Sequence, residues 1–445
     1  PGLNTKVSRS RATCSSLCGV AMLSPQLTRS TRALVRTLAS SNTGLRSPLV
    51  SYASSHSGSA LRSPSWVSVR AFSAQAPGSR IDASNIQIER TKNPKTKPPF
   101  DHTLPFGKVF TDHMLEIEWT RAAGFGTPRI VPHHNLELDP AIPALHYGVQ
   151  CFEGMKAYKD ASGGVRLFRP NLNMNRFAAS CHRLALPELD KEGMQKCIEA
   201  LCRVEEGWVP GTEGCSLYLR PTCIGTTAFL GVSEPSEALI YVIACPVGPY
   251  FANGFAPVKV LAETEYRRAW PGGTGDNKVG GNYAPGLLPQ RLSAQKGYSQ
   301  VLWLFGEEEL VTEIGAMNFF VFWETPEGER ELITAPLDGT ILPGVTRDSI
   351  LRLAEQWGEF KVSERRFTMP QLARAVAEGR LLEVFGAGTA AVVAPVNGIG
   401  YKGEELAIPC GEDGKAGPLT RRLFDDISDI HYGRQEQDGW SVVVP

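Results

Sequence analysis

The pattern of strand-like and helix-like segments stops at one Gly- and Pro-containing stretch, GPYFANGFAP at residues 248–257, and starts again after it. Just before this stretch, EALIYVIACPV is too continuously apolar to be anything but a buried strand. On both sides, strand-like runs alternate with amphipathic segments such as KEGMQKCIEALCRV. A chain of 445 residues also exceeds one ordinary domain. We therefore expect a mixed α/β fold with a small N-terminal domain at about 82–247, a linker at 248–257, a larger domain at 258–445 and a ligand cleft between the two.

Acidic residues are absent from the first part of the chain. Residues 1–81 contain nine Arg and one Lys but no Asp or Glu, whereas the remainder holds 36 basic and 46 acidic side chains, a net charge of −10. Arg29, Arg32 and Arg36 recur at helical spacing among leucines. An Arg-rich, Ser-rich and acid-poor segment is typical of a mitochondrial transit peptide, with an ordinary basic tail as the alternative. We expect residues 1–75 to be such a disordered basic segment and the protein to reside in the mitochondrial matrix.

Composition excludes several classes of function. An apolar content of 42% with 21% charged residues is typical of globular proteins. No uninterrupted apolar run of about 18 residues is present, so no membrane span is expected. The net negative charge of residues 82–445 argues against nucleic-acid binding. Eight of the ten cysteines lie beyond residue 81; they form no C-x-x-C pair and accompany no His cluster at zinc spacing, so we expect free thiols in a reducing compartment and no metal site.

Four segments of the expected larger domain, residues 258–445, have a common explanation if they all surround one ligand. GGTGDNKVGGNY places Lys278 among glycines, which let the backbone approach a planar ligand closely. Glu313 lies between two apolar strands, where a carboxylate requires a cationic partner. ILPGVTRDSIL opens a helix at residues 344–346, whose free N–H groups and Thr hydroxyl suit an anion. FGAGTAAVVAP at residues 385–395 is a second Gly/Thr turn between apolar runs. Each segment alone reads as an ordinary turn or helix start.

Together these segments match the chemical needs of pyridoxal 5'-phosphate. Its aldehyde takes an amine, its ring nitrogen an acid, its phosphate a helix N-terminus and its phenolic oxygen a hydroxyl donor. Seven motifs also occur in the order and near the spacing of one known family: LHYGVQCFEGMKAY, LFRPNLNMNR, SLYLRP, GDNKVGGNYAP, TEIGAMNFF, LPGVTR and FGAGTAAVVAP. The chain resembles the branched-chain amino-acid aminotransferases, which are pyridoxal-phosphate enzymes of fold type IV, from PFGKVFTDHMLEIEW near residue 105 to HYGRQEQDGW near residue 440.

The resemblance implies a role for each matching residue around the cofactor. Lys278 would be the Schiff-base lysine and the acid/base that moves a proton between Cα and C4′. Glu313 would pair with the pyridinium nitrogen, and Tyr283 would donate to the phenolic oxygen. The phosphate would be held by Arg176, Val345, Thr346 and Thr389.

It also implies a substrate pocket. N–H groups of the turn at Thr389 and Ala390 would bind the α-carboxylate, and Arg220 the second carboxylate of glutamate. The pocket would be lined by Phe106, Tyr147, Phe152, Tyr218, Val232 and Ala316. Tyr147 and Val232 would come from a partner subunit, because family members build each site at a dimer interface. For Phe106, Phe152 and Val232, plain core packing remains an equal alternative on sequence grounds.

The expected reaction is reversible transfer of the amino group of L-leucine, L-isoleucine or L-valine to 2-oxoglutarate, giving a branched-chain 2-oxo acid and L-glutamate. The alternatives are a D-amino-acid aminotransferase, an aminodeoxychorismate-lyase-like enzyme or a non-catalytic homologue. We expect a homodimer that binds amino acids and 2-oxo acids. Two departures from the family pattern stand out. Ala391 and Ala394 replace the cysteines of a C-x-x-C found in mammalian relatives, and Ala316 stands where the family commonly has Thr.

Overall fold

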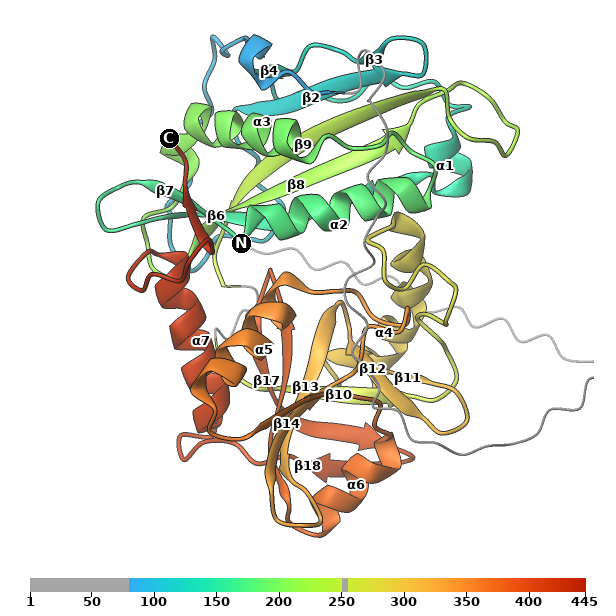
Figure 1. The fold of residues 1–445 in the computed structure, drawn as a ribbon, viewed down its shortest axis with the longest axis vertical. Helices are drawn as coiled ribbons and strands as arrows, with labels where there is room; N and C mark the ends of the chain where they lie inside the picture. The colour runs from blue at the N-terminus through green and yellow to red at the C-terminus, as the bar shows by residue number, and fades with distance from the viewer. Residues whose placement is uncertain (1–79, 250–254) are drawn as a thin grey trace, which may run out of the picture. The chain divides into compact units, whose positions relative to one another are not determined.

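A computed structural model describes residues 80–249 and 255–445 (Figure 1). The expected transit segment and half of the expected linker lie outside these residues. Two β-sheets with helices packed on them form the described chain, which confirms the expected mixed α/β class. No helix within the described ranges is long and apolar enough to cross a membrane.

The first sheet has ten strands. Eight of them follow the order β1-β4-β2-β9-β8-β6-β7-β19, while β3 pairs with β2 and β5 pairs with β8. The bounds are β1 Gln87–Ile88, β2 His113–Thr120, β3 Gly124–Phe125, β4 Arg129–Pro132, β5 Gln150–Phe152, β6 Met155–Lys159, β7 Val165–Phe168, β8 Ser216–Gly225, β9 Glu237–Val247 and β19 Ser441–Val443. The sheet is antiparallel except where β1 pairs with β4.

Helices α2, Pro170–Arg183, and α3, Lys191–Val204, lie against this sheet (Figure 1). Proline at the first position of α2 suits a helix start, since its missing N–H would have had no partner there. The side chain of Asp190 caps α3 by accepting a hydrogen bond from the Gly193 N–H. The apolar faces of both helices join the strands in one buried core that includes Phe177, Ile198 and Leu115. Helix α3 matches the expected amphipathic segment KEGMQKCIEALCRV.

The second sheet has nine strands in the order β12-β11-β10-β17-β16-β13-β14-β15, with β18 paired to β17. The bounds are β10 Val258–Glu263, β11 Gln300–Phe305, β12 Leu310–Ile314, β13 Met317–Glu324, β14 Arg330–Thr334, β15 Lys361–Glu364, β16 Leu381–Gly388, β17 Val392–Tyr401 and β18 Glu404–Ala407. An additional pairing of β12 with β13 closes six of the strands into a ring. The turn of the second Gly/Thr motif is the hairpin between β16 and β17.

The remaining helices are α1 Pro143–Tyr147, α4 Leu287–Gln295, α5 Val345–Trp357, α6 Met369–Ala377 and α7 Pro418–His431, and short 3-10 turns occur at Ala83–Asn85, Glu206–Trp208, Gly280–Asn282 and Ala284–Gly286. One buried cluster contains Tyr158 and Phe168 of the first sheet together with Leu423 and Ile427 of α7. The same cluster includes Phe320 of β13 and Phe385 of β16, so the two sheets share a core, and the described residues belong to one compact unit. A division into two domains at residues 248–257 stays a prediction.

Candidate active site

A cavity of about 390 Å³ opens where elements of both sheets meet. Of the residues expected around cofactor and substrate, all but two line it: Phe106, Phe152, Arg176, Tyr218, Arg220, Lys278, Tyr283, Glu313, Ala316, Val345, Thr346, Thr389 and Ala390. Its volume is in the range of small-molecule sites. Segments that lie far apart in the sequence thus converge on one space.

Tyr147 and Val232 are the two expected site residues that do not line this cavity. The side chain of Tyr147 is 45% exposed at the end of α1, and that of Val232 is 82% exposed in the loop between β8 and β9. The Tyr147 hydroxyl donates to the carbonyl of Leu230 in the same loop, so the two residues belong to one surface region.

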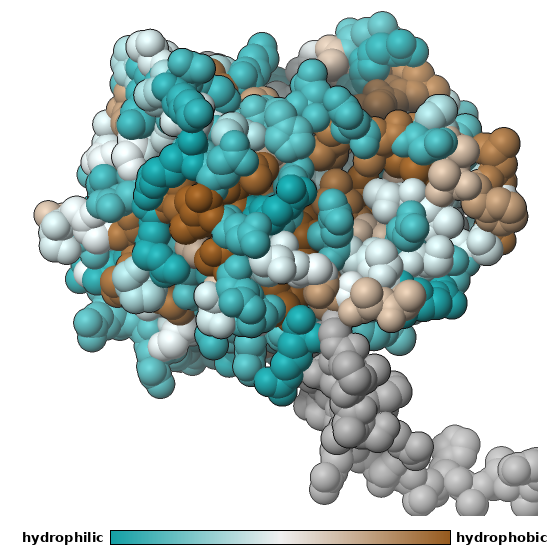
Figure 2. Space-filling model, turned by 90° about the horizontal axis from the view of Figure 1, so that it is seen from above, coloured by the Kyte–Doolittle hydropathy of each residue, from teal (hydrophilic) through white to brown (hydrophobic). Residues whose placement is uncertain are grey.

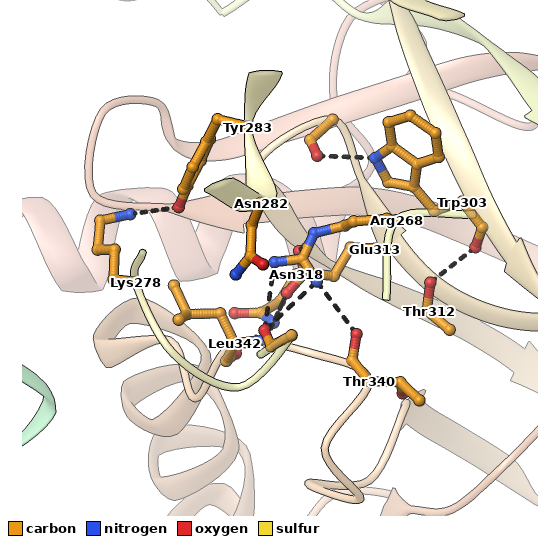
Figure 3. Close-up of polar contacts among 12 residues, drawn as sticks. Arg268, Lys278, Asn282, Tyr283, Trp303, Thr312, Glu313, Asn318, Thr340 and Leu342 are labelled. Atoms are coloured by element: carbon orange, nitrogen blue, oxygen red, sulfur yellow. Dashed lines mark hydrogen bonds and ion pairs between the residues drawn. The ribbon is translucent and has the colours of Figure 1, made fainter. Parts of the chain in front are cut away.

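Two hydrogen bonds hold the backbone of Lys278, and its side-chain amine faces the cavity. Its N–H donates to Oγ of Ser180 in α2 at 2.8 Å, and its carbonyl accepts from the N–H of Phe152 at 3.0 Å. Its Nζ donates to the hydroxyl of Tyr283 at 3.0 Å (Figure 3). Both groups lie near the Phe152 ring, with Nζ of Lys278 4.8 Å from its centroid. The amine of Lys278 and the hydroxyl of Tyr283 therefore lie together at one wall of the cavity.

Glu313 is a buried carboxylate on β12. Its side chain is 2% exposed, and Oε1 accepts from the N–H of Leu342 at 2.7 Å and from Nδ2 of Asn318 at 3.3 Å. Burial raises the pKa of this carboxyl, and the Arg268 guanidinium opposes that rise. Nε of Arg268 lies 2.8 Å from Oε2 of Glu313 (Figure 3).

Arg268 is a residue that sequence reasoning missed. It follows β10 in an irregular segment and also donates to the carbonyl of Thr340 at 3.1 Å. The only signal available in the sequence was a pair of arginines after an apolar strand, in PVKVLAETEYRR. That pattern usually marks a solvated strand end, and Arg267 beside it is indeed exposed.

The N-terminus of α5 provides a site for an anion. Gly344 caps this helix without a side-chain hydrogen bond, and the first two helical residues, Val345 and Thr346, line the cavity, where N–H groups at a helix start suit an anion. Glycine is required at the cap, because a Cβ there would come within 2.1 Å of Oδ1 of Asn318. Thr389, at the tip of the β16–β17 hairpin, lines the same cavity.

Arg176 reaches this region from α2 as half of a buried ion pair. Its Nε and Nη2 donate to the two carboxylate oxygens of Glu153 at 2.7 and 2.8 Å, and its Nη1 donates to the carbonyl of Pro343 at 3.1 Å. Burial alone would raise the pKa of Glu153, but the Arg176 guanidinium holds it below its ordinary value. Glu153 also went unnoticed in the sequence, although it stands inside the LHYGVQCFEGMKAY motif.

Aromatic residues and one arginine form the other end of the cavity. The rings of Phe106 and Tyr218 meet edge to face at 4.9 Å. Nη2 of Arg220 donates to the Tyr218 hydroxyl at 3.0 Å, and its guanidinium lies 4.8 Å from the Phe152 ring centroid. Nε of Arg220 is buried and has no hydrogen-bond partner within residues 80–249 and 255–445. A buried donor of this kind favours a ligand that brings an acceptor.

Comparison with known proteins places this geometry in a family. The model of the amino-transferase class IV family matches residues 150–399, which hold most of the cavity wall. The chain belongs to this family. The branched-chain-amino-acid aminotransferase of Dictyostelium discoideum is 53% identical over 82% of this chain and 96% of its own length. The mitochondrial enzyme of that name from Schizosaccharomyces pombe is 49% identical over 81% of this chain and 85% of its own, and the cytosolic enzyme of Ovis aries is 50% identical over 83% and 96%.

Solved structures agree with the fold of this aminotransferase. The branched-chain amino acid aminotransferase of Escherichia coli has a TM-score of 0.57 and 25% identity, covering 74% of this chain and 99% of that one. The T.th. enzyme of that name with pyridoxamine 5'-phosphate has a TM-score of 0.58 and 28% identity, covering 74% and 98%. The chain is therefore a transaminase of the branched-chain-amino-acid aminotransferase family.

Proposed function

We propose that this aminotransferase exchanges amino groups between L-leucine, L-isoleucine or L-valine and 2-oxoglutarate, with pyridoxal 5'-phosphate held by Lys278. The observation that carries the proposal is the convergence of Lys278, Tyr283, Glu313 and the α5 N-terminus on one cavity. An amine, a hydroxyl donor, a buried carboxylate and an anion site are the four partners that this cofactor needs.

The residues present fit the cofactor. Nζ of Lys278 would hold its aldehyde carbon, the Tyr283 hydroxyl its phenolic oxygen and Glu313 its ring nitrogen. The N–H groups of Val345 and Thr346 would hold the phosphate, together with Arg176 and Thr389, which line the same cavity. When bound, pyridoxal phosphate supplies an aldehyde that accepts the amino group and a protonated ring that withdraws electrons.

Lys278 is suited to move the proton at the substrate Cα. Its anchored backbone keeps Nζ in the cavity, and the Tyr283 hydroxyl is a hydrogen-bond partner already in place. Glu313 contributes a negative charge that a neighbouring Arg268 helps to maintain. Both contributions matter most when negative charge develops at Cα.

Substrate recognition would use the two ends of the cavity. The turn at Thr389 and Ala390 would take the α-carboxylate, while the rings of Phe106, Phe152 and Tyr218 suit an apolar side chain. A second carboxylate, as in glutamate, would find Arg220 with its unpartnered Nε. One pocket could thereby accept both kinds of amino acid.

We also propose that the chain works as a homodimer. Large hydrophobic side chains are exposed around the end of α1 and in the β8–β9 loop: Leu145, Tyr147, Phe229, Leu230 and Val232. The view in Figure 2, from above Figure 1, shows hydrophobic residues open at the surface in several groups. Covering such groups favours association, and a second copy would bring Tyr147 and Val232 to its neighbour's cavity. Light scattering during gel filtration tests this; a monomer at micromolar concentration would contradict it.

For location we propose the mitochondrial matrix. The support is the composition of residues 1–81, which hold ten basic and no acidic side chains. Fusion of these residues to a fluorescent protein should direct it to mitochondria. Diffuse cytosolic fluorescence would contradict the proposal.

The experiment that tests the reaction replaces Lys278 by alanine. Lys278→Ala should abolish the absorption band that pyridoxal phosphate gives when joined to a lysine, together with leucine/2-oxoglutarate transamination. Lys296→Ala changes an exposed lysine at the end of α4 and should leave both unchanged. Near wild-type turnover by Lys278→Ala would refute the assignment.

A further inference from the structure

The hairpin turn between β16 and β17 has an unusual backbone. Thr389, Ala390 and Ala391 connect the two strands, and Val392, the first residue of β17, has a φ of 61°. A β-branched residue in the left-handed region is a true outlier, which persists only where surrounding contacts fix it. No N–H of the three turn residues donates to a protein acceptor within the part of the chain that the structure describes. The turn is therefore strained and its donors are available.

Lys156 supplies a contact that fixes this turn. It lies on β6 of the first sheet, opposite Tyr218 of β8, with its side chain buried. Its Nζ donates to the carbonyl of Ala390 at 2.8 Å, across a sequence separation of 234 residues. Among the described residues it forms no ion pair with a carboxylate, and burial lowers its pKa to about 8. A buried lysine without an acidic partner is uncommon, because its charge must be desolvated.

The peptide geometry connects this contact to the substrate site. No cis peptide bond occurs in the described ranges, so the Ala390 carbonyl and the Ala391 N–H point in opposite directions from one planar unit. A carbonyl held by Lys156 therefore directs that N–H away from Lys156. Ala390 and Ala391 both line the active-site cavity. The ammonium charge also makes the turn a better partner for an anion.

We infer that Lys156 is a positioning residue for the substrate α-carboxylate, holding the Ala390 carbonyl so that the Ala391 N–H of the turn faces the active-site cavity. The inference rests on the proposed function, which assigns that carboxylate to the turn. It predicts an effect shared by leucine and glutamate, since both carry an α-carboxylate. Arg220, by contrast, would affect glutamate selectively.

The test measures binding of 4-methylvalerate, a branched carboxylate without an amino group, to the holoenzyme by titration calorimetry. Lys156→Met should weaken its Kd about tenfold, as expected for loss of one charge-assisted hydrogen bond. It should also raise KM for leucine and glutamate by similar factors, with a smaller change in kcat. Lys156→Arg should restore most of the affinity, because Lys156 lines a neighbouring cavity of about 700 Å³ that leaves room for the larger group.

Lys159→Met is the matched control. Lys159 lies on the same strand, is only half-buried and is remote from the turn, its Nζ donating to the carbonyl of Glu206 at 3.5 Å. Its Kd for 4-methylvalerate should equal that of the wild type. A Kd for Lys156→Met within twofold of the wild type would overturn the inference, as would a failure of Lys156→Arg to recover affinity.

If Lys156→Met does not fold, a crystal structure of the wild-type holoenzyme with 4-methylvalerate tests the positioning role of Lys156. The carboxylate is expected within hydrogen-bond distance of the turn N–H groups, with Nζ of Lys156 still on the Ala390 carbonyl. A carboxylate bound elsewhere, for example on Arg220, would refute the inference. Failure of the proposed function has a different signature, since the wild type would then bind no 4-methylvalerate or show no lysine-linked cofactor band.

Discussion

Nε of Arg268 lies 2.8 Å from Oε2 of Glu313, so the buried acid of the active site has a permanent cationic neighbour. Burial raises the pKa of the Glu313 carboxyl, and Arg268 is the main group that opposes the rise. The pair keeps a negative charge facing the position proposed for the cofactor's ring nitrogen. Arg268 thereby acts through Glu313 rather than on the substrate.

Replacement of Arg268 by methionine should therefore give a pH-dependent loss of kcat. Without the guanidinium, the pKa of Glu313 rises further and part of the enzyme carries a neutral acid at pH 7. We therefore expect kcat to fall at pH 7 and to recover as pH rises and the carboxyl ionises. Glu313→Gln has no charge to recover, so its lower kcat should not improve with pH.

The exposed neighbour Arg267 provides the control for this experiment. Arg267→Met removes the same charge from the adjacent position and should leave the pH profile of kcat unchanged. A loss in Arg268→Met that is equal at all pH values, or confined to cofactor affinity, would contradict the proposed link between Arg268 and Glu313.

Most of the cavity wall could be predicted from the sequence because its residues lie in local motifs. Lys278 and Tyr283 are five residues apart, and Val345 and Thr346 open a helix that the pattern predicts. Arg268, Glu153 and Lys156 could not be found in this way. Their roles come from pairing with residues distant in the sequence, as with Lys156 and the Ala390 carbonyl, and no local pattern records such a contact.

The fold, like the site, could be predicted from the sequence only in part. Long apolar runs such as EALIYVIACPV predict strand β9 correctly. Strand β12, which carries Glu313, was not predicted as a strand, since the sequence only places Glu313 between two apolar strands. Its two pairings, with β11 and β13, close the ring of six strands and depend on tertiary structure. Strand β19 likewise crosses to the first sheet from the C-terminal end of the chain.

Arg220 gives a prediction about dual specificity. Its guanidinium lies beside Tyr218 and Phe152, with Nε buried and unpartnered among the described residues. Arg220→Met should impair kcat/KM for glutamate far more than for leucine, by roughly 2–5 kcal/mol, since only glutamate brings a second carboxylate into the pocket. Steady-state kinetics with each amino donor measure this difference. Equal losses for both donors would show that Arg220 is structural.

Glu331 gives a prediction about acid stability. Burial alone would raise the pKa of this carboxyl on β14, but hydrogen bonds from Arg365, Ser363 and Trp323 lower it from an ordinary value of 4.5 to about 2. An ionised form favoured in the folded state contributes stability above pH 4.5, and this contribution is lost as pH falls through about 2.

Urea unfolding between pH 7 and pH 2 tests this linkage. Glu331→Gln should be less stable than the wild type at pH 7, with the difference shrinking as pH falls below 4.5. Glu329→Gln is the control, because Glu329 is exposed and lies 3.6 Å from Nζ of Lys361. A difference between Glu331→Gln and the wild type that stays constant down to pH 2 would exclude the proposed pKa shift.

The cysteines give the last prediction, which concerns oxidation. Ala391 and Ala394 cannot form a disulfide beside the active-site turn, and of the eight described cysteines only Cys410 is not fully buried. Burial raises the pKa of Cys197 and Cys202 to about 12, so these two thiols provide little thiolate. Hydrogen bonds with Cys151 and Cys181 lower the pKa of Cys223 to about 5, so for this thiol complete burial is what excludes an oxidant.

Three thiols, those of Cys151, Cys181 and Cys223, lie close together behind the active site. Cys151 lies on β5 beside Phe152, and its Sγ is 3.5 Å from Sγ of Cys181, but all three side chains are fully buried and closed to an oxidant. Mild hydrogen peroxide should therefore leave transaminase activity nearly unchanged, and a reductant should restore nothing. Cys151→Ala is the decisive comparison, because it removes the thiol nearest the pocket. If peroxide inactivates the wild type reversibly and Cys151→Ala equally, another cysteine is exposed in solution and the burial argument is wrong.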